Sequence, residues 1–284
     1  MSNLIAGLYS QLTETTGRLI APNAGFMTGP GTNTYFVGDA DGVAVIDPGP
    51  LDAGHVGRIS EVSPGPIRSI LVTHTHRDHS PAATPLKSET GARIYGMAAP
   101  GTPENDPVFA PDTYLDDGDT IAIGDVIIQA VHTPGHASNH LCYLIPAERM
   151  LFTGDHLMNG STVVIAPPDG DMAAYIDSLE KIKELGLATI GPGHGDLIMN
   201  PDAVIDWTIA HRFEREEKIV AALGRHAAAA IDELVHEVYG DVDSRVHGIA
   251  KYSLWAHLEK LLADGSVSRR EQLWWLNRTN TQER

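Results

Sequence analysis

The segment at residues 69–80, SILVTHTHRDHS, constrains the fold of this chain more than any other. Its first half is typical of a buried strand, and four side chains that can bind metals follow directly: His74, His76, Asp78 and His79. Side chains two apart in extended backbone point to the same side, so His74 and His76 can contact one ion. If the chain then bends into a helix, Asp78 and His79 can face a second ion. A solvated turn is the alternative, but this density of ligands favours a metal site.

Four residues cannot satisfy two ions, so further ligands are needed on other loops that follow strands. The sequence offers three, which are His136 after VIIQAV, Asp155 after MLFTG and His194 in LATIGPGHGD. Loops at the C-terminal ends of strands meet at one edge of an α/β sheet. One consistent allocation gives the first ion His74, His76 and His136 and the second ion Asp78, His79 and His194, with Asp155 between them.

The fold class follows from alternating strand and helix patterns. Short apolar runs bounded by Gly and Pro predict strands at 34–38, 43–47, 69–73, 120–124, 126–131, 141–145 and 150–154. Residues 171–185 predict an amphipathic helix capped by Asp171. Such interleaving indicates a layered α/β domain, which we place at residues 1–205.

After Pro201 the chain is mostly helical. Helices are predicted at 202–225, 230–239 and 248–263, and a short two-stranded ribbon follows them. This order is typical of a winged helix-turn-helix, which we place at residues 206–284.

Charge and composition narrow the range of partners. The chain carries 20 Lys and Arg against 37 Asp and Glu, a formal net charge of −17. Residues 1–210 hold 9 basic and 25 acidic side chains, whereas residues 211–284 hold 11 and 12. This balance disfavours polyanionic partners. No run approaches the ~20 apolar residues of a membrane span. With a single cysteine and no secretory signal pattern, the expected location is the cytoplasm.

The motifs THTHRDH, TPGH, FTGD and GPGHG resemble those of the metallo-β-lactamase superfamily over about residues 25–200. The segments GPGTNTYFVG, VIDPG and AHLEKLLADGSV are similar to the branch called β-lactamase-like protein 2, which carries a C-terminal winged helix. The resemblance implies a four-layer αβ/βα sandwich with its metals at one edge. Members of the branch and its relatives include endoribonucleases and thioesterases. The resemblance also implies that Asp47 orients a ligand histidine, with a plain turn at a strand end as the alternative.

Several other polar residues have a structural interpretation. Asn33 and Asn139 are expected to make local hydrogen bonds rather than to line a pocket. His140 is expected to be buried or to support a ligand, while His132 and His156 are left out of the ligand set. Trp274 and Trp275 are expected to attach the ribbon to the body of the protein.

The predicted chemistry is hydrolysis. Structural zinc sites are usually closed cages rich in cysteine, and these loops contain none. We therefore predict an open centre of two divalent ions sharing a bridging hydroxide, which acts as the nucleophile. Asp78 is expected to hold the water and to move its proton. Imidazole and carboxylate ligands suit zinc best, with manganese and iron as alternatives.

The substrate stays open at this stage. A small acyl substrate, such as a thioester, ester or lactone, fits the acidic body and is preferred. Cleavage of single-stranded RNA fits the winged helix, and RNA would then bind the basic groups Arg212, Arg215, Lys218, Arg269 and Arg270. A β-lactamase and a metal-sensing DNA-binding regulator are weaker alternatives. The winged helix is otherwise expected to shape the pocket or to form a homodimer contact.

Overall fold

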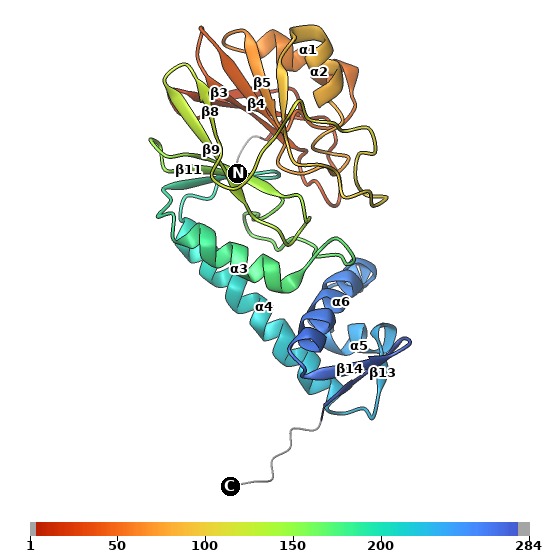
Figure 1. Cartoon of the computed structure of the whole chain (residues 1–284). Helices are drawn as coiled ribbons and strands as arrows, with labels where there is room; N and C mark the ends of the chain where they lie inside the picture. Colours follow the sequence, from red (N-terminus) through yellow and green to blue (C-terminus); the bar gives the residue numbers. More distant parts are fainter. Residues whose placement is uncertain (1–3, 278–284) are drawn as a thin grey trace.

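The computed structural model describes residues 4–277. Two mixed β-sheets pack face to face and carry helices on their outer faces (Figure 1). The first sheet has seven strands in chain order, β1 (Tyr9–Gln11), β2 (Thr16–Ile20), β3 (Asn33–Gly38), β4 (Val43–Ile46), β5 (Ile67–Leu71), β6 (Arg93–Gly96) and β7 (Thr113–Tyr114). The second has five in the order β12 (Thr189–Pro192), β11 (Met150–Gly154), β10 (Leu141–Ile145), β9 (Val126–His132) and β8 (Thr120–Ile123).

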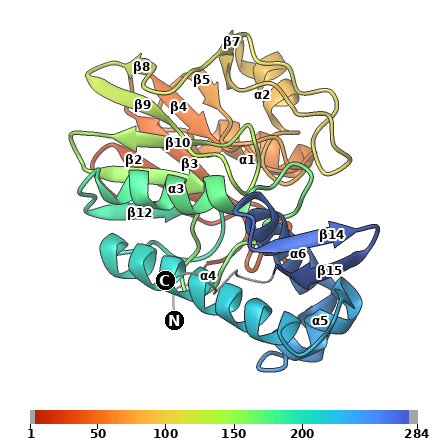
Figure 2. The same cartoon turned by 60° about the horizontal axis from the view of Figure 1, so that its bottom comes forward.

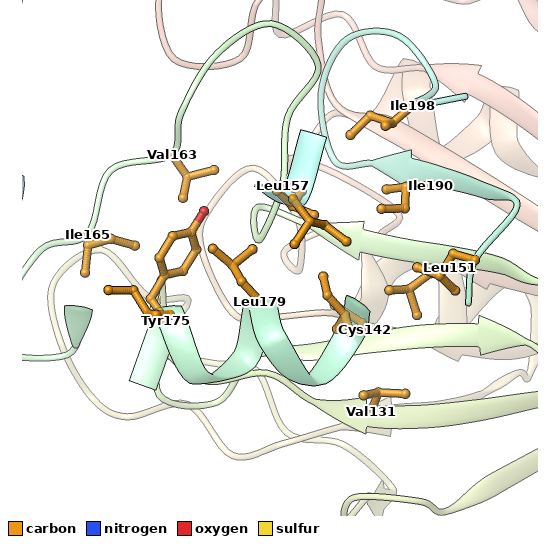
Figure 3. Packing of buried hydrophobic residues seen from close by; sticks show 14 of the residues in the cluster. Val131, Cys142, Leu151, Leu157, Val163, Ile165, Tyr175, Leu179, Ile190 and Ile198 are labelled. Carbon is orange, nitrogen blue, oxygen red and sulfur yellow. The ribbon is translucent and has the colours of Figure 1, made fainter. Parts of the chain in front are cut away.

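Three hydrophobic layers hold this domain together. Between the sheets, the Tyr35 and Phe152 rings lie 4.7 Å apart in a cluster that both sheets build. A second cluster joins the first sheet to α1 (Ala53–Val62) and α2 (Ala83–Thr90). A third joins the second sheet to α3 (Met172–Lys183) and is seen in Figure 3. The result is the expected four-layer αβ/βα sandwich.

The central strands are buried along their whole length, as their almost continuous apolar sequences predict. The predicted helix at 171–185 is α3, and the Asp171 carboxylate caps it by accepting hydrogen bonds from the Ala173 and Ala174 amides. Parallel pairing aligns the ends of β4 with β5 and of β11 with β12. Loops that carry polar residues therefore leave adjacent strands at one edge.

The C-terminal part begins on α4 (Pro201–Leu223), which runs from beneath α3 into the winged helix (Figures 1 and 2). It contains α5 (Ile231–Val238), the 3-10 turn η1 (Ser244–Val246), α6 (His247–Ala263) and a small sheet of β13 (Ala229–Ala230), β14 (Val267–Arg270) and β15 (Leu273–Leu276). Trp274 is buried in its core. The predicted boundary after residue 205 lies inside α4, so that division stays a prediction. No helix of residues 4–277 has the length and apolar character to span a membrane.

Candidate metal centre

Three imidazoles converge at the edge of the sandwich. His74 and His76 follow β5, and His136 follows β9 from the other sheet. The Nε2 atom of His74 lies 2.9 Å from His76 Nδ1, and His136 Nε2 lies 3.0 Å from the same atom. The three could hold one metal ion. The structure thus brings together residues 60 positions apart.

A second group of donors lies beside the first. His194 Nε2 is 3.1 Å from Asp78 Oδ2 and 3.3 Å from Asp155 Oδ1. His79 Nε2 is 3.4 Å from the same Asp155 oxygen. These four residues could also hold an ion. The other Asp155 oxygen lies 3.8 Å from His136 Nε2, so this carboxylate faces both groups. All seven residues named from the sequence therefore lie together.

The loop after β5 differs from the expected helix. The amides of His79 and Ser80 donate to the His76 carbonyl at 3.0 and 3.2 Å, which makes a tight turn. Helix α2 begins only at Ala83, and no side chain caps it. The turn alone brings Asp78 and His79 to the second group, because it reverses the chain over four residues. The chain therefore bends at a turn rather than a helix after His76, and Asp78 and His79 still face the second group.

Two glycines allow close packing around the site. A Cβ on Gly193 would lie 2.7 Å from Asp155 Oδ1 and 2.8 Å from His79 Cε1. Gly135, at φ +142°, precedes His136, and a Cβ there would lie 2.4 Å from Tyr175 Cα. Side chains at either position would displace the donors.

The outward-facing nitrogens of the histidines are held by hydrogen bonds. Asp47 Oδ2 accepts from His79 Nδ1 at 2.8 Å, which confirms the expected contact. His136 Nδ1 donates to the Val164 carbonyl at 2.7 Å, and His194 Nδ1 donates to the Gly31 carbonyl at 3.3 Å. Each bond fixes the proton on Nδ1 and leaves Nε2 directed into the site.

His74 is fixed in the same way. Thr73 Oγ1 donates its only proton to Asp47 Oδ2 at 2.7 Å, so it accepts from His74 Nδ1 at 3.0 Å. The Nε2 lone pair of His74 then faces His76. Burial, together with the neighbouring histidines, lowers the pKa of His74 well below its ordinary value, which keeps the ring neutral.

In the second group the pKa values of the histidines are raised, whereas the pKa of His74 in the first group is lowered. Burial lowers the pKa of His194, but the carboxylates of Asp155 and Asp78 outweigh it and raise the value to about 9. The same carboxylates, with Asp47, raise the pKa of His79 well above its ordinary value against the effect of burial. Burial would raise the pKa of Asp155, yet His194 and His79 hold it well below the usual range. The carboxylates of this group therefore favour positive charge beside them.

These donors fit a pair of divalent cations. Bonds of 2.0–2.1 Å in a tetrahedral zinc site place two ligand nitrogens roughly 3.3 Å apart, close to the separations seen here. The buried atoms His79 Nε2, His194 Nε2 and Asp155 Oδ1 make no hydrogen bond. Such orphaned groups are costly unless something satisfies them, and a cation would.

The two asparagines differ from expectation. Asn33 donates to the carbonyls of Pro192 and Gly195, and Asn139 donates to Thr75 Oγ1, so both bond to segments distant in the sequence and the predicted local bonds were wrong. His140 is buried and stacked on His74 at 4.9 Å. Sequence reasoning missed Thr73, Gly31 and Val164. The last two act through carbonyl groups that every residue carries, so no sequence signal could have found them.

The basic groups of the C-terminal part are largely engaged with other groups. Arg212 and Arg215 are buried in α4 rather than exposed. Lys218 pairs with Asp241 at 2.6 Å, and Arg269 pairs with Glu259 while lying 4.9 Å from the Trp274 ring. The RNA alternative needs a basic surface on α4, and the two arginines of this helix do not supply it.

The layered sandwich with donors from both sheets at one edge defines a class of protein, and comparisons agree. Residues 27–194 match the model of the metallo-β-lactamase superfamily, and residues 230–274 match the β-lactamase associated winged helix domain. The chain belongs to this superfamily and is a metal-dependent hydrolase with a C-terminal winged helix.

Several relatives match both the metallo-β-lactamase domain and the winged helix, because the alignments extend over about nine tenths of the chain. The beta-lactamase-like protein 2 homolog of Caenorhabditis elegans is 30% identical over 90% of this chain and 87% of that protein. The atrochrysone carboxyl ACP thioesterase AacuM of Aspergillus aculeatus is 29% identical over 91% and 84%. A solved beta-lactamase domain protein from Burkholderia ambifaria superposes with a TM-score of 0.81 at 20% identity, over 96% and 94%. Another solved structure, described as a di-iron-bound form, superposes with a TM-score of 0.51 at 25% identity. The match covers 65% of this chain and 96% of that one.

Proposed function

We propose that this chain is a dinuclear metal hydrolase acting on small acyl substrates, with a thioester as the preferred class. One observation carries the proposal, namely the two adjacent donor groups that share Asp155. His74, His76 and His136 would hold one ion, and Asp78, His79 and His194 the other. Zinc is the proposed metal. Iron stays an alternative, since a related structure is described as di-iron-bound, and manganese stays open as well.

The bound ions would lower the pKa of a water molecule and polarise the substrate carbonyl. The protein itself must move a proton, and Asp78 is the residue proposed to do so. Its side chain is 28% exposed, whereas that of Asp155 is 11% exposed. Burial raises the pKa of Asp78, but His79 and His194 outweigh it and lower the value, so the carboxylate is ionised at neutral pH. We assign to Asp78 Oδ2 the acceptance of the attacking water's proton and its transfer to the leaving group.

Charge supports an acyl substrate over RNA. The net charge of −17 repels polyanions, and the arginines of α4 are buried. A relative is named as an acyl carrier protein thioesterase. The winged helix remains the observation in favour of RNA, so RNA enters the test as a competing outcome. A homodimer stays a prediction.

The loop of residues 22–31 adds a further reason. It ends at Thr32, whose hydroxyl donates to the Asp78 carbonyl at 3.0 Å and whose backbone pairs with His194. The same loop exposes Phe26 and Met27. Exposed apolar side chains on a loop whose end contacts the donors suit an acyl chain better than a phosphodiester.

The test is a turnover panel with metal analysis. Protein loaded with zinc, manganese or iron is assayed on a pantetheine thioester, an ester, a lactone, a phosphodiester and single-stranded RNA. We expect two ions per chain and fastest turnover of the thioester. His136→Ala should lose about one ion and at least ~100-fold in rate. His132→Ala is the matched control, because its ring faces the Ser138 carbonyl of the same loop. One ion or none in the wild type, or preferred cleavage of RNA, would contradict the proposal.

A further inference from the structure

A short segment of chain connects the candidate metal centre to the C-terminal helices. We call residues 163–165 the strap. The Val164 carbonyl accepts from His136 Nδ1 at 2.7 Å. On either side, the Val163 carbonyl accepts from Arg212 Nη2 at 2.6 Å, and the Ile165 amide donates to Ser253 Oγ at 3.4 Å. Arg212 lies on α4 and Ser253 on α6. Three consecutive residues thus join one donor histidine to two helices.

The two outer residues of the strap are buried and closely packed, while Val164 is half-buried. Val163 is 3% exposed and Ile165 is fully buried, and both lie beside the Tyr175 ring (Figure 3). Side chains in such a core have few alternative positions, so a displacement of the strap backbone is transmitted to its neighbours. The Val164 carbonyl therefore determines where the His136 ring points.

Arg212 is also linked to the second donor group, through the Tyr175 ring and the backbone next to Asp155. Its guanidinium carbon lies 5.2 Å from the centre of the Tyr175 ring. The Tyr175 hydroxyl donates to the His156 carbonyl at 2.9 Å, directly after Asp155 in the chain. One cationic side chain from α4 thus supports the backbone beside both His136 and Asp155.

The burial of Arg212 calls for an explanation beyond helix packing. The side chain is 2% exposed, its Nε makes no hydrogen bond, and it forms no ion pair with a carboxylate among residues 4–277. A buried charge in this state is costly, and an apolar side chain of similar size would often stabilise the fold more. Arg215, one turn along α4, shows an ordinary structural use, because it pairs with Asp241 at 2.7 Å and lies over Tyr239.

We propose that Arg212 is a positioning residue for the metal centre, acting through the strap on the His136 ring. The winged-helix part then supplies, by way of α4 and α6, the support that keeps one ligand in place. This inference rests on the proposed function, because it takes His136 as a ligand.

The experiment compares Arg212→Met with Arg215→Met in the full-length protein. Both variants remove a buried guanidinium from the same helix, and the melting temperature of each is measured to establish that it folds. Zinc affinity is measured by competition with a chromophoric chelator, and ligand geometry is read from the absorption spectrum of the cobalt-substituted protein. Loss of a group that supports a ligand typically weakens metal binding 10- to 100-fold. Arg212 contacts the residue next to the one that supports His136, so its effect should lie at the lower end of this range. We expect Arg212→Met to weaken zinc binding about 10-fold at one of the two ions and to alter the cobalt spectrum.

Arg215→Met should keep the wild-type zinc affinity and cobalt spectrum. If the two variants bind both ions with the same affinity and give the same spectrum, the proposal is overturned. If Arg212→Met does not fold, the comparison of Arg212→Gln with Arg215→Gln replaces it under the same criterion, since glutamine stays polar but lacks the guanidinium that donates to the Val163 carbonyl.

Failure of the proposed function would look different. In that case the wild type itself would not bind two ions, or His136→Ala would keep both. A wild type with two ions, a His136→Ala variant with one and an unaffected Arg212→Met variant would reject only the positioning role.

Discussion

Asp47→Asn tests how the protein fixes the proton of a ligand histidine. Asp47 Oδ1 accepts from the Thr73 amide at 2.8 Å, while Oδ2 accepts from the Thr73 hydroxyl and from His79 Nδ1. The backbone of Asp47 has φ of 50°, a conformation that asparagine adopts as readily as aspartate. The substitution therefore changes the acceptor set without adding backbone strain.

Asparagine can satisfy only part of this arrangement, because one of its terminal atoms donates. If its NH2 group faces the Thr73 amide, two donors meet, and a buried N–H left unsatisfied costs about 1–3 kcal/mol. If the NH2 group faces His79 instead, Nδ1 must accept, and the ring proton moves to Nε2. That nitrogen faces Asp155 and Asp78, so a proton there competes directly with the metal.

Either arrangement weakens the second ion. We expect a loss of 10- to 100-fold in zinc affinity, or about 1.4–2.7 kcal/mol, at one of two ions. Chelator competition measures the loss, and elemental analysis after dialysis counts the ions. Asp52→Asn is the control, because Asp52 caps α1 by accepting from the His55 amide and asparagine caps equally well. An Asp47→Asn protein that holds both ions as tightly as the wild type would refute this reasoning.

Three further outcomes are expected. Gly135→Ala should displace His136 from Tyr175 and lose about one ion by elemental analysis, whereas unchanged metal content would show that the loop can adjust. Burial lowers the pKa of His55 to about 4, so its stabilising contribution is complete above pH 6.5 and lost as pH falls toward 4. Metal-free His55→Gln should therefore have a flatter melting-temperature profile over that range, and parallel profiles would contradict this. Phe26→Ser should raise KM for long-chain thioesters by up to about 10-fold with kcat nearly unchanged, whereas an equal effect on short-chain substrates would exclude an acyl contact.

The donor set was predictable because each ligand follows a strand end or lies in a Gly-rich turn. The register of the paired strands then brings the loops that carry these residues together. Ile46 pairs with Leu71, which sets Asp47 near Thr73, and Gly154 pairs with Pro192, which sets Asp155 near His194. A sequence with strong apolar runs at these positions has few other ways to align its loops.

Other elements were beyond the sequence patterns. Strands β1, β2, β6, β7, β12 and β13 and helices α1 and α2 were not predicted, and the predicted two-stranded ribbon is a three-stranded sheet. Strand β1 has three residues and β7 has two, too few to show an alternating pattern. Helix α2, at eight residues with no capping side chain, has no start signal and depends on packing against the first sheet. Tertiary contacts stabilise these short strands and helices, and such contacts produce no hydrophobic periodicity in the local sequence.

The arginines of α4 show how a pattern can be present and still be misread. Buried positions on this helix recur at helical spacing, at Ile205, Thr208, Arg212, Arg215, Ile219 and Ala222. Reading Arg212, Arg215 and Lys218 as a basic face ignored that the first two fall on the apolar stripe.

This placement bears on function as well as packing. A buried charge attracts a polyanion only weakly. Lys218, Arg225 and Arg269 are each paired with a carboxylate, while Arg270 is exposed. The winged helix therefore offers little free positive charge for nucleic acid, although its fold is one that nucleic-acid binders use. What its buried arginine does reach is the strap behind His136. The same residue that weakens the case for RNA thus connects this domain to the hydrolytic centre.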